Sequence, residues 1–236
     1  DTLDGGANID TASYSGSGQS VNVNLNTGIA IGGEATGDVL IGVENLDGSA
    51  QADTLVGDGA ANQLRGDQGS DVLSGEGGID TIEGGDGFDT IEGGAGGGSL
   101  VGGADNDDTA SYAGSGVGVA VNLGAGTASG GDAAGDTLVG FENLLGSEQS
   151  DTLGGDTGAY RIAGAGGADT LTGGAGGDTL DGGDGFDVAD YSGSMAGAIN
   201  INLENGTASG GDADGDSFVS IENLFGTNAN DTLAGG

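Results

Sequence analysis

The sequence has 236 residues, of which 38 are acidic and two are arginines, and its formal net charge is −36. A chain with so few cations cannot neutralise a phosphate backbone, so nucleic acid is a poor partner. The chain contains no His and no Cys, which excludes soft metal sites and His- or Cys-based nucleophiles, and no apolar run is long enough for membrane insertion.

Glycine supplies 59 residues, a composition typical of disordered chains. The strict sequence repeats, however, indicate a folded repeat protein, and we give them more weight than the composition. In chain order we expect nonapeptide runs and longer β segments to alternate within one continuous solenoid over 1–236. The nonapeptide runs are 5–13, 48–111, 146–190 and 226–236, and the longer segments are 14–47, 112–145 and 191–225. Both ends fall inside a repeat, so we expect a piece of a longer array.

Each nonapeptide follows the pattern G-G-x-G-x-D-x-U-x, where U is a large apolar residue, as in GGDGFDTIE at 84–92. The first six positions predict a turn whose glycines expose backbone carbonyls. The last three predict a short strand with one inward side chain. The inward residues are Leu55, Leu64, Leu73, Ile82, Ile91, Leu100, Leu153, Ile162, Leu171, Leu180 and Leu233.

The longer segments repeat one another and alternate apolar and polar residues, as in VNVNL at 21–25. This alternation predicts strands longer than those of the nonapeptides, continuing the same stack. Each segment carries an E-N-L triplet, and we expect the glutamates of these triplets, Glu44, Glu142 and Glu222, to make structural hydrogen bonds. Tyr14, Tyr112 and Tyr191 recur at one place and are interpreted as packing anchors.

The spacing of the long segments predicts the architecture. Glu44 and Glu142 lie 98 residues apart, Glu142 and Glu222 lie 80 apart, and the difference is 18, or two nonapeptides. If each nonapeptide makes half a coil, removing two deletes one whole coil and leaves everything downstream on its original face, whereas removing one would swap the faces. The sequence therefore predicts an all-β fold, a right-handed parallel β-roll with about 18 residues per coil.

The nonapeptide resembles the RTX, or hemolysin-type, calcium-binding repeat. Oxygen donors without nitrogen or sulfur suit Ca²⁺ better than Mg²⁺. The resemblance implies several ions, each held between a turn and the turn one coil later by carbonyls of the glycines and by the sixth-position residue. Those glycines are Gly66, Gly69, Gly75, Gly78, Gly84, Gly85, Gly87, Gly164, Gly167, Gly173, Gly174, Gly176, Gly182, Gly183 and Gly185. The sixth-position residues are Asp10, Asp53, Asn62, Asp71, Asp80, Asp89, Asp108, Asp151, Asp169, Asp178, Asp187 and Asp231.

Some turns depart from the pattern. Gly98 and Tyr160 replace the aspartate, and frames 48–56 and 146–154 lack two of the glycines. Turns one residue longer, such as GGDADGD at 210–216, add the candidate ligands Asp38, Asp136 and Asp216. For Asp86 and Asp184, third in their turns, we favour solvated charges over ligands.

Stacked carboxylates repel one another, and the inward aliphatics do not offset the backbone entropy, so we expect a largely unfolded apo chain. The RTX resemblance implies secretion by a type I system and folding in calcium outside the cell or at its surface. We expect a non-enzymatic, calcium-rigidified rod of an adhesin, surface layer or matrix fibre, which associates end to end or continues into further repeats. Two alternatives stay open: the folding and secretion tail of an enzyme (protease, lipase or epimerase), and an ice- or glycan-binding surface.

Overall fold

The computed structural model describes residues 1–104 and 107–236, which form short β-strands and three 3₁₀ turns. Two compact units are present. The first holds residues 1–111 and 132–141, and the second holds residues 112–131 and 142–236. The nonapeptide predicted at 103–111 includes residues 105–106, which lie outside the described residues. The single solenoid over 1–236 stays a prediction.

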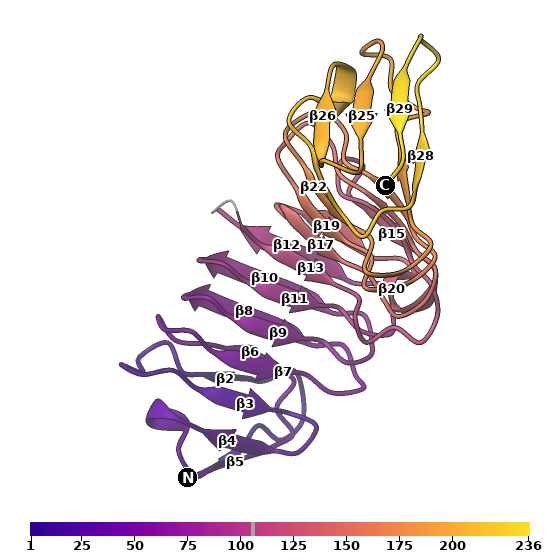
Figure 1. Ribbon diagram of the computed structural model, residues 1–236. Coiled ribbons are helices and arrows are strands. Elements are labelled where there is room, and N and C mark those ends of the chain that lie inside the picture. The colour runs from indigo at the N-terminus through magenta and orange to yellow at the C-terminus, as the bar shows by residue number, and fades with distance from the viewer. Residues whose placement is uncertain (105–106) are drawn as a thin grey trace. The chain divides into compact units, whose positions relative to one another are not determined.

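The first unit consists of two stacked sheets (Figure 1). One sheet has the order β1 (Thr2–Asp4), β5 (Asp38–Ile41), β4 (Ile29–Ile31), β3 (Asn22–Asn24), β7 (Thr54–Val56), β9 (Val72–Ser74), β11 (Thr90–Glu92) and β13 (Thr109–Ser111). The other has the order β2 (Thr11–Ser13), β6 (Asn45–Asp47), β8 (Gln63–Gln68), β10 (Thr81–Asp86), β12 (Ser99–Gly103) and β16 (Thr137–Val139).

Successive nonapeptides place their strands alternately in the two sheets. Leu64 in β8 pairs in parallel with Ile82 in β10, and Leu73 in β9 pairs with Ile91 in β11. The two residues of each pair are 18 positions apart in the sequence. Asp53 and Asp71, which are hydrogen-bonded in the turns, have the same separation. A coil is therefore two nonapeptides, and the predicted parallel β-roll is confirmed.

The core is one column of large aliphatic side chains from each sheet. Leu55, Leu64, Leu73, Ile82 and Ile91 are fully buried. A three-residue strand points only its middle side chain inward, so each nonapeptide contributes one core residue. The flanking positions are occupied by Thr, Val, Ser and Glu and face solvent or the turns. Repeating one buried aliphatic per nine residues is thus enough to build the core.

The long segments join the sheets through strands of three or four residues, so the prediction of strands longer than those of the nonapeptides is wrong. These segments also add a feature that the sequence did not predict. In each segment the chain turns back as an antiparallel hairpin, such as β3 with β4. The hairpin turn follows N-L-x-x-G: Asn24 Oδ1 accepts the Thr27 N–H at 2.8 Å, and Gly28 has φ +68°. Each segment also has a 3₁₀ turn, which is η1 (Gly33–Ala35), η2 (Gly131–Ala133) or η3 (Gly211–Ala213).

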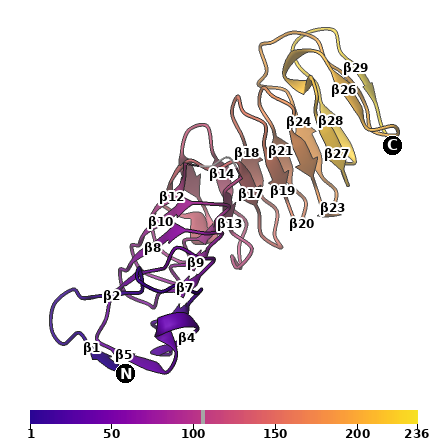
Figure 2. The same ribbon diagram turned by 90° about the vertical axis from the view of Figure 1, so that its left-hand side faces the viewer.

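The second unit repeats this plan (Figure 2). One sheet has the order β15 (Thr127–Ser129), β14 (Ala120–Asn122), β18 (Thr152–Gly154), β21 (Thr170–Thr172), β24 (Val188–Asp190) and β28 (Asn223–Phe225). The facing sheet has β17 (Asn143–Leu145), β19 (Arg161–Ala163), β22 (Thr179–Asp181) and β27 (Ser217–Val219). Two small sheets pair β20 (Gly166–Gly167) with β23 (Asp184–Gly185), and join β26 (Thr207–Ser209), β25 (Asn200–Asn202) and β29 (Thr232–Ala234).

One predicted core residue is wrong. Leu233 is 40% exposed, because β29 is the edge strand of its sheet and pairs only with β25 there. The other ten predicted inward residues are at most 1% exposed. Over the described ranges, 1–104 and 107–236, no helix is both long enough and apolar enough to cross a membrane.

Candidate metal centres

The nonapeptide turns stack directly on one another, and glycine makes this stacking possible. Gly87, the fourth residue of its turn, has φ +133°, and a Cβ there would lie 1.6 Å from the carbonyl oxygen of Gly69, one coil earlier. Positive φ is costly for residues with a side chain. Only glycine therefore allows the backbone of one turn to approach the next this closely.

The predicted glycines divide by their place in the turn. The first-position glycines Gly66, Gly75, Gly84, Gly164, Gly173 and Gly182 lie against the sixth-position carboxylate of their own turn. Positive φ occurs at the second-position Gly85, Gly174 and Gly183 and at the fourth-position Gly69, Gly78, Gly87, Gly167 and Gly176. Gly185, also fourth, lacks positive φ, but a Cβ there would lie 1.6 Å from the Gly167 carbonyl oxygen.

In every sixth-position aspartate except Asp10, one oxygen accepts a backbone N–H of the coil before it. Asp71 Oδ1 accepts the backbone N–H of Asp53 at 2.7 Å, and Asp169 Oδ1 accepts that of Asp151 at 2.8 Å. The same bond is made by Asp53, Asp80, Asp89, Asp108, Asp151, Asp178, Asp187 and Asp231, and also by Asp136 and Asp216 in the longer turns. These hydrogen bonds form a ladder of carboxylates along each side of the roll.

The other carboxylate oxygen, Oδ2, lacks a hydrogen-bond partner in several of these aspartates. The Oδ2 atoms of Asp10, Asp71, Asp169, Asp178 and Asp187 are buried and have no hydrogen-bond partner. A buried ionised oxygen without a partner is costly, so each such atom calls for a counter-charge. A Cβ built on Gly66 would lie 2.1 Å from Asp71 Oδ2 and 2.6 Å from the Gly84 carbonyl oxygen, so both oxygens converge on one point beside the glycine.

Burial disfavours the charged form of these aspartates. It raises the pKa of Asp71 to about 7 and the pKa values of Asp80, Asp169 and Asp178 to about 6. The hydrogen bond from the preceding coil opposes the rise, and neighbouring carboxylates add to it. The pKa of Asp187 is raised for the same reasons. At neutral pH the buried aspartates of this ladder therefore carry negative charge that destabilises the folded state.

Calcium fits this donor set. The turns offer carboxylate and carbonyl oxygens, which are the ligands of a hard cation with six to eight coordination positions. Among the residues that the structure describes, no three acidic side chains gather closely enough to hold a metal by themselves. A turn that follows the pattern supplies one sixth-position carboxylate, so the remaining oxygens have to come from the backbone. An ion bound there supplies the counter-charge that the buried oxygens lack.

Other predicted ligands accept a hydrogen bond from a serine or threonine of their own turn. Asp53 Oδ2 accepts the Ser49 N–H, and Asp151 Oδ2 accepts the Ser147 N–H at 2.6 Å. Asp231 Oδ1 accepts the Thr227 hydroxyl at 2.9 Å as well as the Ile199 N–H. Serine or threonine at the second position is the sequence signal for this arrangement, and sequence reasoning missed it.

Asn62 and the aspartates of the longer turns are also held by protein groups. Asn62 donates to the Glu44 carbonyl at 2.8 Å and accepts the Asp58 N–H at 2.8 Å. Asp38 accepts the Tyr14 hydroxyl at 3.3 Å and the N-terminal amino group at 2.7 Å. Asp216 Oδ2 accepts the Tyr191 hydroxyl.

The tyrosines and glutamates of the long segments are structural. Tyr14, Tyr112 and Tyr191 are at most 4% exposed. Burial and Asp38 together raise the pKa of Tyr14 to about 12. Glu44 Oε2 accepts the Asp10 N–H at 2.9 Å, and Glu222 Oε2 accepts the Asp187 N–H at 2.8 Å, so these glutamates make the ladder bond that an aspartate makes elsewhere.

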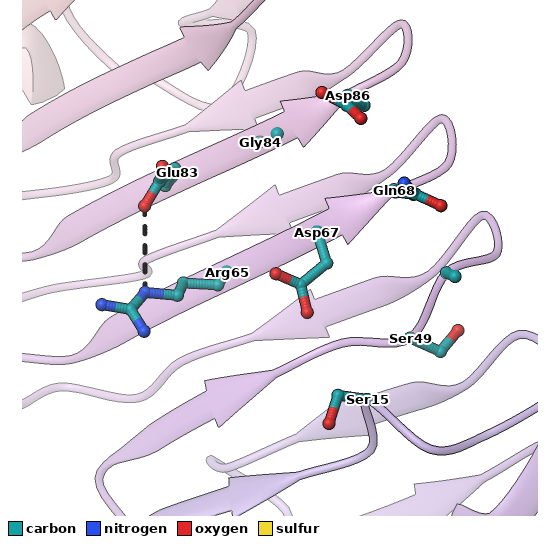
Figure 3. A pocket seen from close by; sticks show the side chains of 10 residues that line it. Ser15, Ser49, Arg65, Asp67, Gln68, Glu83, Gly84 and Asp86 are labelled. Atoms are coloured by element: carbon teal, nitrogen blue, oxygen red, sulfur yellow. Dashed lines mark ion pairs between the residues drawn. The ribbon is translucent and has the colours of Figure 1, made fainter.

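An open groove of about 580 Å³ lies over strands β8 and β10 of the first unit (Figure 3). Ser15 and Ser49 lie at one side of it, and Arg65 pairs with Glu83 at 3.8 Å. Asp86 also lines the groove and is exposed, as is Asp184 in the second unit. Burial and the nearby carboxylate of Asp47 raise the pKa of Asp67 in this groove, and Arg65 opposes the rise.

Comparison with known families identifies these turns. The family model described as RTX calcium-binding nonapeptide repeat (4 copies) matches residues 40–73, 74–109 and 154–189. The chain carries RTX calcium-binding repeats. Calcium is therefore the cofactor of this chain, as the donor set indicates. The candidate ligands Asp10, Asp38, Asp136, Asp151, Asp216 and Asp231 lie outside the matched RTX ranges. The comparison with curated proteins found no match.

Proposed function

We propose that this chain is a calcium-dependent structural module of a secreted bacterial protein. It stays unfolded where calcium is scarce and folds on binding calcium outside the cell. The observation that carries the proposal is the set of buried Oδ2 atoms without a hydrogen-bond partner. Folding places these charges in the interior, so the fold needs the ion.

The proposal extends to a supporting role in an adhesin, a surface layer or an extracellular matrix fibre, reached by type I secretion. The repeats occupy both units, and the long segments contribute strands to the same sheets rather than forming separate cores. The carboxylates with raised pKa values recur at equivalent positions along the roll. That recurrence supports metal binding over a single tuned acid–base pair, so we propose that the module is not an enzyme.

Limited proteolysis tests the proposal. The chain is incubated with a non-specific protease in chelator, in 5 mM magnesium or in 5 mM calcium, concentrations that are roughly extracellular for calcium. We expect rapid digestion in chelator and magnesium, and protection of both units in calcium. Equal protection in all three conditions would show that the strands hold the fold without an ion, and equal digestion would show that calcium does not fold this chain.

A further inference from the structure

We propose that the first coil of each of the two long nonapeptide runs, 48–111 and 146–190, closes without an ion of its own, and that calcium sites in these runs begin with the third nonapeptide. The two coils are residues 48–65 and 146–163, and we call them the starter coils. This inference rests on the proposed function and specifies which turns of the module take calcium.

The first turn of each starter coil is closed by a serine. Ser147 donates its N–H to Asp151 Oδ2 at 2.6 Å and its hydroxyl to Asp151 Oδ1 at 3.0 Å. Ser49 makes the equivalent bonds to Asp53, with its hydroxyl 3.0 Å from Oδ1. These contacts provide the partners that a cation provides elsewhere, so the buried carboxylate is satisfied without one.

The second turn of each starter coil has no carboxylate at its sixth position. Asn62 directs its amide nitrogen to the Glu44 carbonyl oxygen at 2.8 Å, and its oxygen accepts the Asp58 N–H. Tyr160 instead donates its hydroxyl to Asp156 Oδ1 at 2.6 Å, and the same oxygen accepts the Gly158 N–H at 2.9 Å. Both turns are thus closed by bonds within the protein.

The next turn in each of these runs is open, by which we mean that its buried carboxylate has an oxygen without a hydrogen-bond partner. Asp71 and Asp169 make the same Oδ1 bond to the preceding coil. Their Oδ2 atoms, however, have no partner. The change from closed to open therefore falls at the same place in both runs, between the second and the third nonapeptide.

The starter coils also hold both of the chain's basic side chains. Arg65 of the first starter coil lies 3.8 Å from Glu83 in the following coil, as Figure 3 shows, and Arg161 of the second lies 3.9 Å from Asp181. The two arginines are exposed, and such pairs contribute little stability individually. Their positions place a permanent positive charge in the coils that lack open carboxylates. Each run thereby begins with a coil on which calcium-loaded coils stack.

Bound calcium per chain, measured by equilibrium dialysis, tests the inference in a matched pair of variants. Asp151→Asn and Asp169→Asn change the same position of the turn, one coil apart in the same column. We expect Asp169→Asn to lower the bound calcium by about one ion and Asp151→Asn to leave the number unchanged. Far-UV circular dichroism in saturating calcium verifies that both variants are folded.

Tyr160→Asp supplies a second measurement if Asp151→Asn does not fold. It restores the sixth-position carboxylate and should add about one bound ion. Loss of an ion in Asp151→Asn, or no gain in Tyr160→Asp, would overturn the starter coils while leaving the calcium-dependent module in place. A wild-type chain that binds no calcium would instead overturn the proposed function.

Discussion

Replacing Asp71 by Asn should stabilise the roll in chelator, and calcium should remove most of that gain. Asp71 is 1% exposed, and burial raises its pKa from 3.8 to about 7. At pH 8 without calcium, the folded state therefore carries a cost of about 4 kcal/mol for ionising this carboxyl. Asn removes the charge, keeps an oxygen for the Asp53 N–H, and presents an amide donor toward the Gly84 carbonyl oxygen.

In calcium the same substitution removes a ligand. An ion present at about a hundred times its dissociation constant contributes about 2.7 kcal/mol to stability, and the variant loses most of this. We expect Asp71→Asn to be more stable than the wild type in chelator by up to about 4 kcal/mol. In calcium this advantage should fall to about 1–2 kcal/mol, because the lost ion offsets about 2.7 kcal/mol of the gain.

Urea unfolding followed by circular dichroism measures both effects, with sulfate added to populate the folded state in chelator. Asp86→Asn is the matched control, because Asp86 is an exposed turn carboxylate, and it should change stability by less than about 0.5 kcal/mol in either condition. A shift of the same size in chelator and in calcium would refute the reasoning that Asp71 is a buried charge that binds a cation.

Three further predictions concern the core, the turns and the pH dependence. Ile82→Ala should cost about 2–5 kcal/mol in calcium by urea unfolding, because Ile82 is fully buried, whereas Ile79→Ala, at a site 73% exposed, should cost under about 0.5 kcal/mol; equal costs would contradict the core assignment. Ala165→Gly should raise the thermal midpoint, with a gain of about 1 kcal/mol, because Ala165 has φ +72°, which is unfavourable for a residue with a side chain. Ala163→Gly in strand β19 should lower the midpoint. Shifts of both midpoints in one direction would show that the backbone at Ala165 is not strained. In chelator with sulfate, the raised carboxyl pKa values mean that the folded state binds more protons than the unfolded state. Stability should therefore be greatest below about pH 4 and fall as the pH rises to about 7. Urea midpoints that rise between these pH values would contradict the burial of these carboxyls.

The fold could be predicted because one buried aliphatic and one glycine turn recur every nine residues, and a shared period constrains all strands at once. The 18-residue coil was predicted from the distances between Glu44, Glu142 and Glu222 together with the nine-residue period. The antiparallel hairpins were missed because the alternating residues 21–25 were read as a strand without the turn that follows. Asn24 and Gly28 carried that signal, since asparagine closes such a turn and glycine accepts positive φ.

The site could be predicted only in part. The aspartate period locates the carboxylates, but it does not reveal which oxygen finds a protein partner. That depends on the turn conformation, which brings Ser147 onto Asp151 and leaves Asp169 Oδ2 without a partner. The contact between Tyr191 and Asp216 joins residues 25 positions apart, and no local pattern announces it.

The most direct test of the account is far-UV circular dichroism of the whole chain during a calcium titration from a chelated start, with magnesium as the control. The account predicts a cooperative transition from coil to β structure at micromolar to millimolar calcium, and none with magnesium. A β signal already present in chelator, unchanged by calcium, would contradict the claim that the buried carboxylates of Asp71 and its equivalents make the fold depend on the ion.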